Sequence, residues 1–164
     1  MKKSSWDYIF VGLQFCLFVL FAILILLPHP GVQDWPKWVL ILGDILLISG
    51  GLSTLVAILQ LGDSLTAYPT PKSNAALRTH GLYRWVRHPI YGGILLCTLG
   101  ISLNEASLLL LGITLLLGIL FYYKSKYEEK GLIQYYGASY LEYRKTRGRF
   151  FPKLTNIWIS NTEQ

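Results

Sequence analysis

A dense run of arginine, histidine and tyrosine residues, LRTHGLYRWVRHPIYGG, occupies residues 77–93 and leads directly into an apolar stretch. Pro89 suits the first turn of a helix, where its missing N–H costs nothing. The free N–H groups of that turn, with the helix dipole behind them, favour an anionic or electron-rich ligand group. The segment with Arg87 and His88 is therefore a candidate binding site. The alternative interpretation is an interfacial belt of Arg, Trp and Tyr that anchors the chain at lipid headgroups.

A pair of adjacent carboxylates, Glu128-Glu129, follows the last apolar run by about one helical turn. The Asn104-Glu105 connection between the last two apolar runs is so short that these runs must form an antiparallel hairpin. The hairpin returns the acidic pair to the membrane face that carries Arg87. The alternative is an acidic pair on a solvated helix face beside neighbouring lysines.

A short helix is predicted after Gly137, which can end the preceding helix, because Ser139 and Glu142 have the spacing of a capping box. Its aromatic and basic residues are Tyr140, Tyr143, Arg144 and Arg147. We predict that this helix lies flat on the membrane, with its tyrosines over the binding cleft. Arg144 would then gather an anionic headgroup or carboxylate from the acceptor. Simple attraction of the arginines to the anionic leaflet is the alternative.

The elements that must position these residues are strongly apolar. The chain has 164 residues, of which 52% are hydrophobic and 15% charged, whereas a soluble domain has about 25% charged residues. Four apolar runs occupy residues 8–27, 38–61, 90–103 and 106–123. A helix needs about 20 such residues to cross a hydrocarbon core of about 30 Å. The sequence therefore predicts one all-α membrane domain with about four transmembrane helices and short interfacial helices after the last.

The third run is the shortest, and this has a consequence for the candidate site. Its 14 residues rise only about 21 Å as a helix. Arg87 and His88 are therefore expected below the headgroup plane, at the floor of a cleft. Polar residues at that depth are costly and suggest a function.

Orientation follows from the lysines and arginines. Of the 15 in the chain, only Lys37 lies in the first loop between runs, and none lies in the 104–105 turn. Because basic residues favour the cytoplasmic side, we expect both termini, the loop 62–89 and the tail 124–164 to be cytoplasmic. The site would face the cytoplasm as well. The net charge of +6 then reflects topology and lipid contact, and a nucleic-acid partner is a poor explanation because the charges flank membrane spans.

The N-terminus, the cysteines and three glycines allow further predictions. The apolar run after the basic N-terminus is too long for a cleavable signal and lacks a small-residue cleavage site. Cys16 and Cys97 lie inside apolar runs as packing residues, and the spacing of Cys and His residues predicts no metal site. Gly43, Gly50 and Gly51 allow close helix packing within or between chains, so the oligomeric state stays open.

The order of these motifs resembles the membrane methyltransferases, which include isoprenylcysteine carboxyl methyltransferase and the phospholipid N-methyltransferases. The resemblance covers residues 62–152. The matching pattern is Gly81-x-Tyr83, then Arg87-His88-Pro89-x-Tyr91-x-Gly93, then a hairpin, then Glu128-Glu129, and finally the tail LIQYYGASYLEYRK at 132–145. The chain departs from the family at Leu82, where proline is usual, and in residues 54–61 and 121–123, which contain no arginine.

The resemblance implies S-adenosylmethionine as the methyl donor, S-adenosylhomocysteine as the product, and a membrane lipid or lipidated acceptor. Carried over by position, the cofactor-binding residues are Gly81, Tyr83, His88, Pro89, Tyr91, Glu128 and Glu129. Glutamates can accept hydrogen bonds from ribose hydroxyls or from the methionine ammonium. Tyrosine faces can hold a sulfonium, with about 0.5–2 kcal/mol for each ring, and the helix start can receive the methionine carboxylate.

Candidate catalytic residues are Arg87, His88 and Glu128, with Arg87 as the cation nearest the transferred methyl. Candidate substrate contacts are Tyr140, Tyr143 and Arg144. A carboxylate acceptor needs no general base, because its pKa of about 4 leaves it ionised. An amine acceptor would need deprotonation by His88 or a glutamate. Three functions remain open at this stage: methylation of an isoprenylcysteine carboxylate, methylation of a phospholipid amine, and a non-catalytic lipid-binding module.

Overall fold

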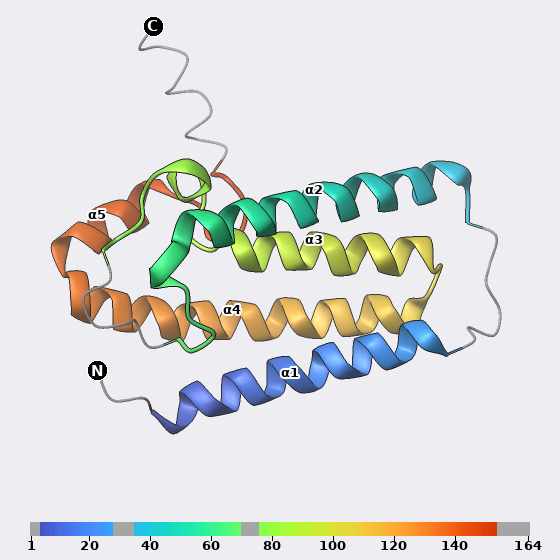
Figure 1. Ribbon diagram of the computed structural model, residues 1–164, viewed down its shortest axis with the longest axis horizontal. Helices are drawn as coiled ribbons and strands as arrows, with labels where there is room; N and C mark the ends of the chain where they lie inside the picture. Colours follow the sequence, from blue (N-terminus) through green and yellow to red (C-terminus); the bar gives the residue numbers. More distant parts are fainter. Residues whose placement is uncertain (1–3, 28–34, 70–75, 154–164) are drawn as a thin grey trace, which may run out of the picture.

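Four long helices and one short helix form the computed structural model, which describes residues 4–27, 35–69 and 76–153 (Figure 1). The α-helices are α1 (Ser5–Leu26), α2 (Lys37–Leu61), α3 (Pro89–Asn104), α4 (Leu108–Tyr136) and α5 (Ala138–Thr146), and the 3-10 turns are η1 (Gly62–Ser64) and η2 (Gly81–Arg84). The described residues form no β-strand beyond one isolated bridge between Val86 and Gly148. The prediction of an all-α protein is therefore confirmed.

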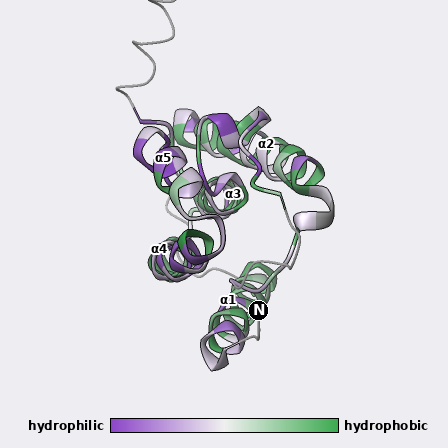
Figure 2. Cartoon of the chain, turned by 90° about the vertical axis from the view of Figure 1, so that its left-hand side faces the viewer, coloured by the Kyte–Doolittle hydropathy of each residue, from purple (hydrophilic) through white to green (hydrophobic). Residues whose placement is uncertain are grey.

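The four long helices are threaded antiparallel, in the spatial order α2, α3, α4, α1 (Figures 1 and 2). Figure 2 shows the bundle end-on, from the end that carries α5. Helices α1 and α3 begin at this end, and helices α2 and α4 end there. Hydrophilic residues gather on α5 and on the segments beside it (Figure 2). The hairpin between the last two spans thus brings the end of α4 back to the start of α3, as the short turn predicts.

Three of these helices, α1, α2 and α4, are long and apolar enough to cross a membrane. Helix α3 is shorter, with 16 residues, which rise about 24 Å. Much of the apolar surface points outward; only Asp7 and Phe21 of α1 are buried. Outward apolar side chains suit a hydrocarbon environment, in which the backbone polar groups are satisfied within each helix. The chain is accordingly a membrane protein with the short third helix that its sequence predicts.

Helix α4 differs from its predicted span at both ends. It begins after Ser107, whose hydroxyl accepts a hydrogen bond from the Leu110 N–H at 3.4 Å. It then continues past residue 123 to Tyr136 as one helix of 29 residues. The predicted capping box at Ser139 is wrong, because α5 starts at Ala138 and has no side-chain cap. Gly137, with φ of +59°, instead permits an abrupt turn between the two helices.

Helices α2 and α3 pack through two pairs of glycines. A Cβ atom at Gly50 would lie 2.6 Å from the Gly93 carbonyl oxygen, and one at Gly100 would lie 2.5 Å from the Gly43 carbonyl oxygen. Any larger residue would force the two backbones apart, so these glycines allow the close approach that membrane helices exploit. Two of the predicted packing glycines therefore act within the chain. Gly51 faces outward and is not part of this contact.

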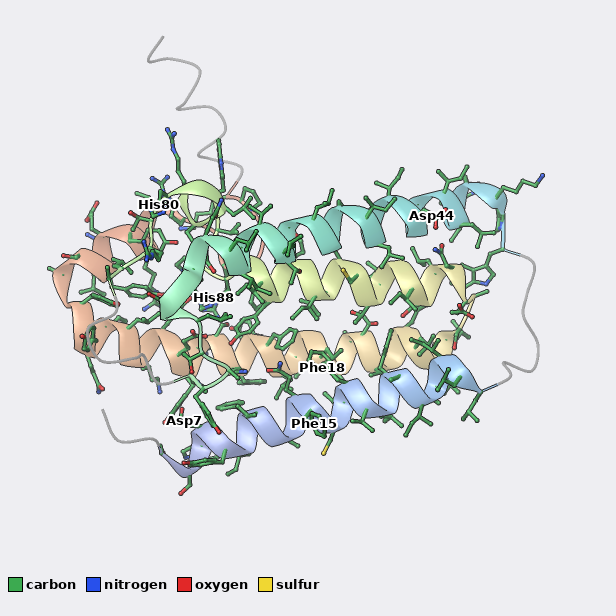
Figure 3. The ribbon with its side chains drawn as sticks, viewed as in Figure 1. Asp7, Phe15, Phe18, Asp44, His80 and His88 are labelled. Carbon is green, nitrogen blue, oxygen red and sulfur yellow. The ribbon has the colours of Figure 1, made fainter. Side chains whose placement is uncertain are left out.

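Helix α1 is attached to α4 through aromatic packing. Phe18 points from α1 toward α4 (Figure 3), and its ring centroid lies 6.5 Å from that of Phe121. Phe21 joins Leu110, Leu117 and Phe121 in the buried hydrophobic core. These contacts place the second half of α1 beside the part of α4 that leads to the candidate site.

Candidate active site

The segment before α3 is held in place by the C-terminal segment, which crosses it. The Arg87 N–H donates to the Gly148 carbonyl and the His88 N–H donates to the Arg149 carbonyl, both at 2.9 Å. The ring of Phe150 meets His88 edge to face, with centroids 6.3 Å apart. Residues that are 61 or 62 positions apart in sequence thus form one unit, and the C-terminal segment fixes the start of α3.

Glu129 is the electrostatic centre of this unit. Its carboxylate lies 2.9 Å from Arg87 Nε, 3.2 Å from His88 Nε2, and 3.4 Å from both Arg144 Nε and Arg149 Nη2. Its side chain is only 3% exposed. One carboxylate therefore ties α4 to α5, to the segment before α3 and to the C-terminal segment.

Glu128, the neighbouring residue, has a different environment. The Tyr91 hydroxyl donates to Glu128 Oε2 at 3.1 Å, and His88 Nδ1 lies 3.6 Å from the same oxygen. Glu128 lines a cavity of about 330 Å³, whereas Glu129 does not. Of the predicted acidic pair, Glu128 can therefore contact a ligand while Glu129 organises the walls.

The cavity is bounded by all five α-helices, by η2 and by the loop after α2. Its lining includes most of the predicted site residues, namely Tyr83, Arg87, His88, Pro89, Tyr91, Glu128, Tyr140 and Tyr143. One face of α4 contributes Lys124, Glu128, Leu132 and Tyr136 at intervals of four residues. Because a helix rises 1.5 Å per residue, this face extends about 18 Å along the cavity. His88 lies where α3 begins, at the opposite end of the bundle from Asp44 (Figure 3).

Lys124 lies one helical turn deeper than Glu128 and is 1% exposed. Its ammonium donates to Gln14 Oε1 at 2.5 Å and to the Ala67 carbonyl at 3.0 Å. It also lies 5.4 Å from the centroid of the Tyr91 ring. Among the described residues, no carboxylate lies within ion-pairing distance of this ammonium. The inner end of the cavity therefore presents a buried cation held by neutral oxygens.

The tyrosines that line the cavity stay neutral. Burial raises the pKa of Tyr143 to about 12, and its hydroxyl donates to the Tyr83 carbonyl at 2.7 Å. Burial also raises the pKa values of Tyr83 and Tyr140 well above 10. The Tyr83 hydroxyl donates to the Ala57 carbonyl at 3.3 Å. These phenols are therefore hydrogen-bond donors at neutral pH rather than bases.

Several predicted site residues have structural contacts outside the cavity. Gly81 adopts φ of +61° and packs against Gln60, whose Oε1 accepts the Leu82 N–H at 2.8 Å. Arg144 is 44% exposed and contacts Glu129. Arg147 follows the last residue of α5, so the prediction that it belongs to this helix is wrong. Neither Gly81 nor Arg144 lines the cavity.

Arg87 reaches the cavity but is also heavily engaged. Besides Glu129, its Nη1 donates to the carbonyls of Arg144 and Arg147 at the end of α5. Its side chain is 7% exposed. The guanidinium thus fastens α5 to the segment before α3.

Sequence reasoning missed Lys124, Gln14 and Arg149. Two of them carried a usable signal: Lys124 precedes Glu128 by four residues, which places both on one helix face, and Gln14 is an isolated amide in a long apolar run. Arg149 carried none, because its contact with Glu129 depends on the path of the C-terminal segment.

Comparison with known proteins gives matches that cover the site. Residues 38–139 match the phospholipid methyltransferase family. Protein-S-isoprenylcysteine O-methyltransferase A of Arabidopsis thaliana is 33% identical over 71% of this chain and 60% of its own length. Methanethiol S-methyltransferase of Pseudomonas deceptionensis is 32% identical over 73% of this chain and 44% of its own length. The chain thus spans roughly half the length of these relatives.

A solved structure shares the fold. The eukaryotic intramembrane Ras methyltransferase, isoprenylcysteine carboxyl methyltransferase, superposes with a TM-score of 0.67 and 25% identity, over 93% of this chain and 54% of that one. Because the family match extends over more than half of the chain, from α2 to the first residues of α5, this chain belongs to the phospholipid methyltransferase family.

Proposed function

We propose that this protein is an S-adenosylmethionine-dependent methyltransferase that acts at the membrane on a lipid-borne anion, such as an isoprenylcysteine carboxylate. The observation that carries the proposal is the order of charges in one cavity, with Glu128 at its centre and Lys124 one turn deeper. The relatives named above methylate, by their names, an isoprenylcysteine or methanethiol. Both names are compatible with acceptors that react as anions.

The residues present fit a methyl donor of this kind. Glu128 supplies a carboxylate for a ribose hydroxyl or an ammonium group. Ile90 and Tyr91 line the cavity in the first turn of α3, where N–H groups have no partner within the helix and favour a carboxylate. When bound, S-adenosylmethionine would supply a methyl group on a sulfonium, which the acceptor takes as the carbon–sulfur bond breaks.

The inner cation favours an anionic acceptor over an amine. The ammonium of Lys124 can pair with a carboxylate, whereas it repels a protonated amine. A carboxylate with a pKa of about 4 also needs no base. Both ring nitrogens of His88 face glutamate oxygens, an arrangement that suits donation by the imidazole rather than proton abstraction. The chain's own residues thus orient and neutralise an acceptor that is already ionised.

Transfer of a radiolabelled methyl group tests this function. Purified protein in detergent is incubated with labelled S-adenosylmethionine and either a total lipid extract or a detergent-soluble S-prenylcysteine. We expect a base-labile methyl ester as the product. A base-stable N-methyl product would instead support a phospholipid amine acceptor. Binding of S-adenosylhomocysteine without transfer to any lipid would support a non-catalytic module.

We also propose that the cavity opens on the cytoplasmic side, with both termini on that side, because the basic residues concentrate at this end. The test uses a variant in which Cys16 and Cys97 are removed. New cysteines replace Lys37, the first residue of α2, and Glu142 on α5, and both positions are exposed. We expect an impermeant thiol reagent to label them from opposite sides of sealed vesicles. Labelling from one side would contradict this topology. The loop positions Gln33 and Ser73, which suit the same test, lie outside the described residues.

A further inference from the structure

Two buried polar atoms in the cavity lining have no hydrogen-bond partner among the residues that the structure describes. They are the hydroxyl of Tyr140 and Nε of Arg78. Tyr140 is 1% exposed, so solvent does not satisfy its hydroxyl, and buried polar groups without partners are uncommon in folded proteins. The cavity therefore offers two donors to a ligand that carries hydrogen-bond acceptors.

Tyr140 enters the cavity from α5, near Glu128 and Glu129, whereas the proposed acceptor site is at Lys124 on α4. It follows the end of α4 by four residues, at the start of α5, whereas Lys124 lies about 18 Å back along α4 from Tyr136. The charged groups that act on its hydroxyl are Glu129, Arg87 and Glu128. This placement separates Tyr140 from the lysine that would hold the acceptor.

The surfaces around Tyr140 suit a flat, partly apolar ring. Leu132 and Tyr136 line the same end of the cavity on α4, and Leu77 adjoins Arg78 in the lining. A purine presents apolar faces to such side chains and nitrogen acceptors at its edge, which hydroxyl and guanidinium groups can reach. If the ribose of a nucleoside contacts the carboxylate of Glu128, its base would therefore lie beside Leu132, Tyr136 and Tyr140.

We propose that Tyr140 and Arg78 bind the adenine base of the methyl donor, which makes the outer end of the cavity its nucleoside subsite. This assignment rests on the proposed function, since it concerns the same donor. It moves Tyr140 from the acceptor side, where its sequence position suggested it, to the donor side. The assignment also gives Arg78 a role in binding the donor. Arg78 makes no ion pair with the other described residues.

The test compares two ligands in binding calorimetry on the purified, detergent-solubilised chain. S-adenosylhomocysteine carries the base and the amino acid, and methylthioadenosine carries only the nucleoside. We expect Tyr140→Phe and Arg78→Gln each to weaken both ligands by the same factor, about 3- to 10-fold, because one hydrogen bond to the base is lost. Tyr123→Phe and Arg84→Gln, which change exposed residues outside the cavity, should leave both affinities unchanged.

Other outcomes would overturn the inference in distinct ways. Weaker binding of S-adenosylhomocysteine alone would place the two side chains at the amino-acid part. Unchanged affinities in both variants, with a higher KM for the lipid acceptor, would return them to the acceptor side. A native chain that binds neither ligand would overturn the proposed function itself. Since Tyr140→Phe removes only an unpartnered hydroxyl, its melting temperature without ligand should not fall, which separates a binding effect from unfolding.

Discussion

Glu128→Gln is expected to weaken S-adenosylhomocysteine binding by about 10- to 150-fold, because a charge-assisted hydrogen bond to the ligand contributes about 1.5–3 kcal/mol. The carboxylate lines the cavity, and its contacts within the protein are the Tyr91 hydroxyl and one nitrogen of His88. Glutamine preserves the size of the side chain and can still accept from Tyr91. Calorimetry should therefore show lower affinity with little change in thermal stability.

Glu129→Gln is the matched control, since it makes the same chemical change one residue away. Here we expect a fall of about 3–5 kcal/mol in the free energy of unfolding, because removal of one partner leaves the buried charge of Arg87 uncompensated and takes an ion-pair partner from two less buried arginines. The affected cations are Arg87, Arg144 and Arg149. Urea unfolding in detergent measures the difference. Equal stability of the two variants, or an unchanged affinity in Glu128→Gln, would contradict this division of roles.

Lys124→Met is expected to lower kcat/KM for a carboxylate acceptor by about 100-fold or more, the usual effect of losing one preorganised charge at a reacting group. Methionine has a side chain of similar length but lacks the charged ammonium group. Affinity for S-adenosylhomocysteine should stay nearly the same, because the acceptor is absent from that measurement. Steady-state kinetics with an S-prenylcysteine and calorimetry together separate the two effects.

Lys126→Met serves as the control for this variant. Lys126 is an exposed lysine of α4, and its ammonium lies over the Tyr122 ring at 5.4 Å from the centroid, away from the cavity lining. We expect its kinetics to match those of the native chain. An increase in activity of Lys124→Met toward an amine acceptor would contradict the anionic assignment, because loss of a cation relieves repulsion of a protonated amine.

The sequence by itself determined the membrane class, the antiparallel threading and the end of the bundle that carries the candidate site. These properties follow from local information. Long apolar runs are stable only in hydrocarbon, and the 104–105 turn is too short for any arrangement except a hairpin. Pro89 likewise marks the start of α3 in the sequence, and the structure begins the helix there. Each of these features depends on a few neighbouring residues.

The sequence also indicated that Glu128 and Glu129 lie near His88, but it did not separate their contacts. Successive residues on a helix point about 100° apart, so one faces the cavity and the other faces α5 and the C-terminal segment. Which of them faces the cavity depends on how α4 is rotated against its neighbours. The sequence of α4 does not encode that rotation locally, because it results from packing with α1, α3 and α5.

Only the tertiary structure decided the remaining parts of the site. The hydrogen bonds from Arg87 and His88 to Gly148 and Arg149 join segments about 60 residues apart, and no local pattern specifies such a pairing. The contact of Gln14 with Lys124 spans 110 positions. The energy of these contacts depends on burial, which charged and polar side chains acquire only when the helices pack around them. Sequence motifs therefore indicated where the chemistry lies, and packing decided which side chains can reach a ligand.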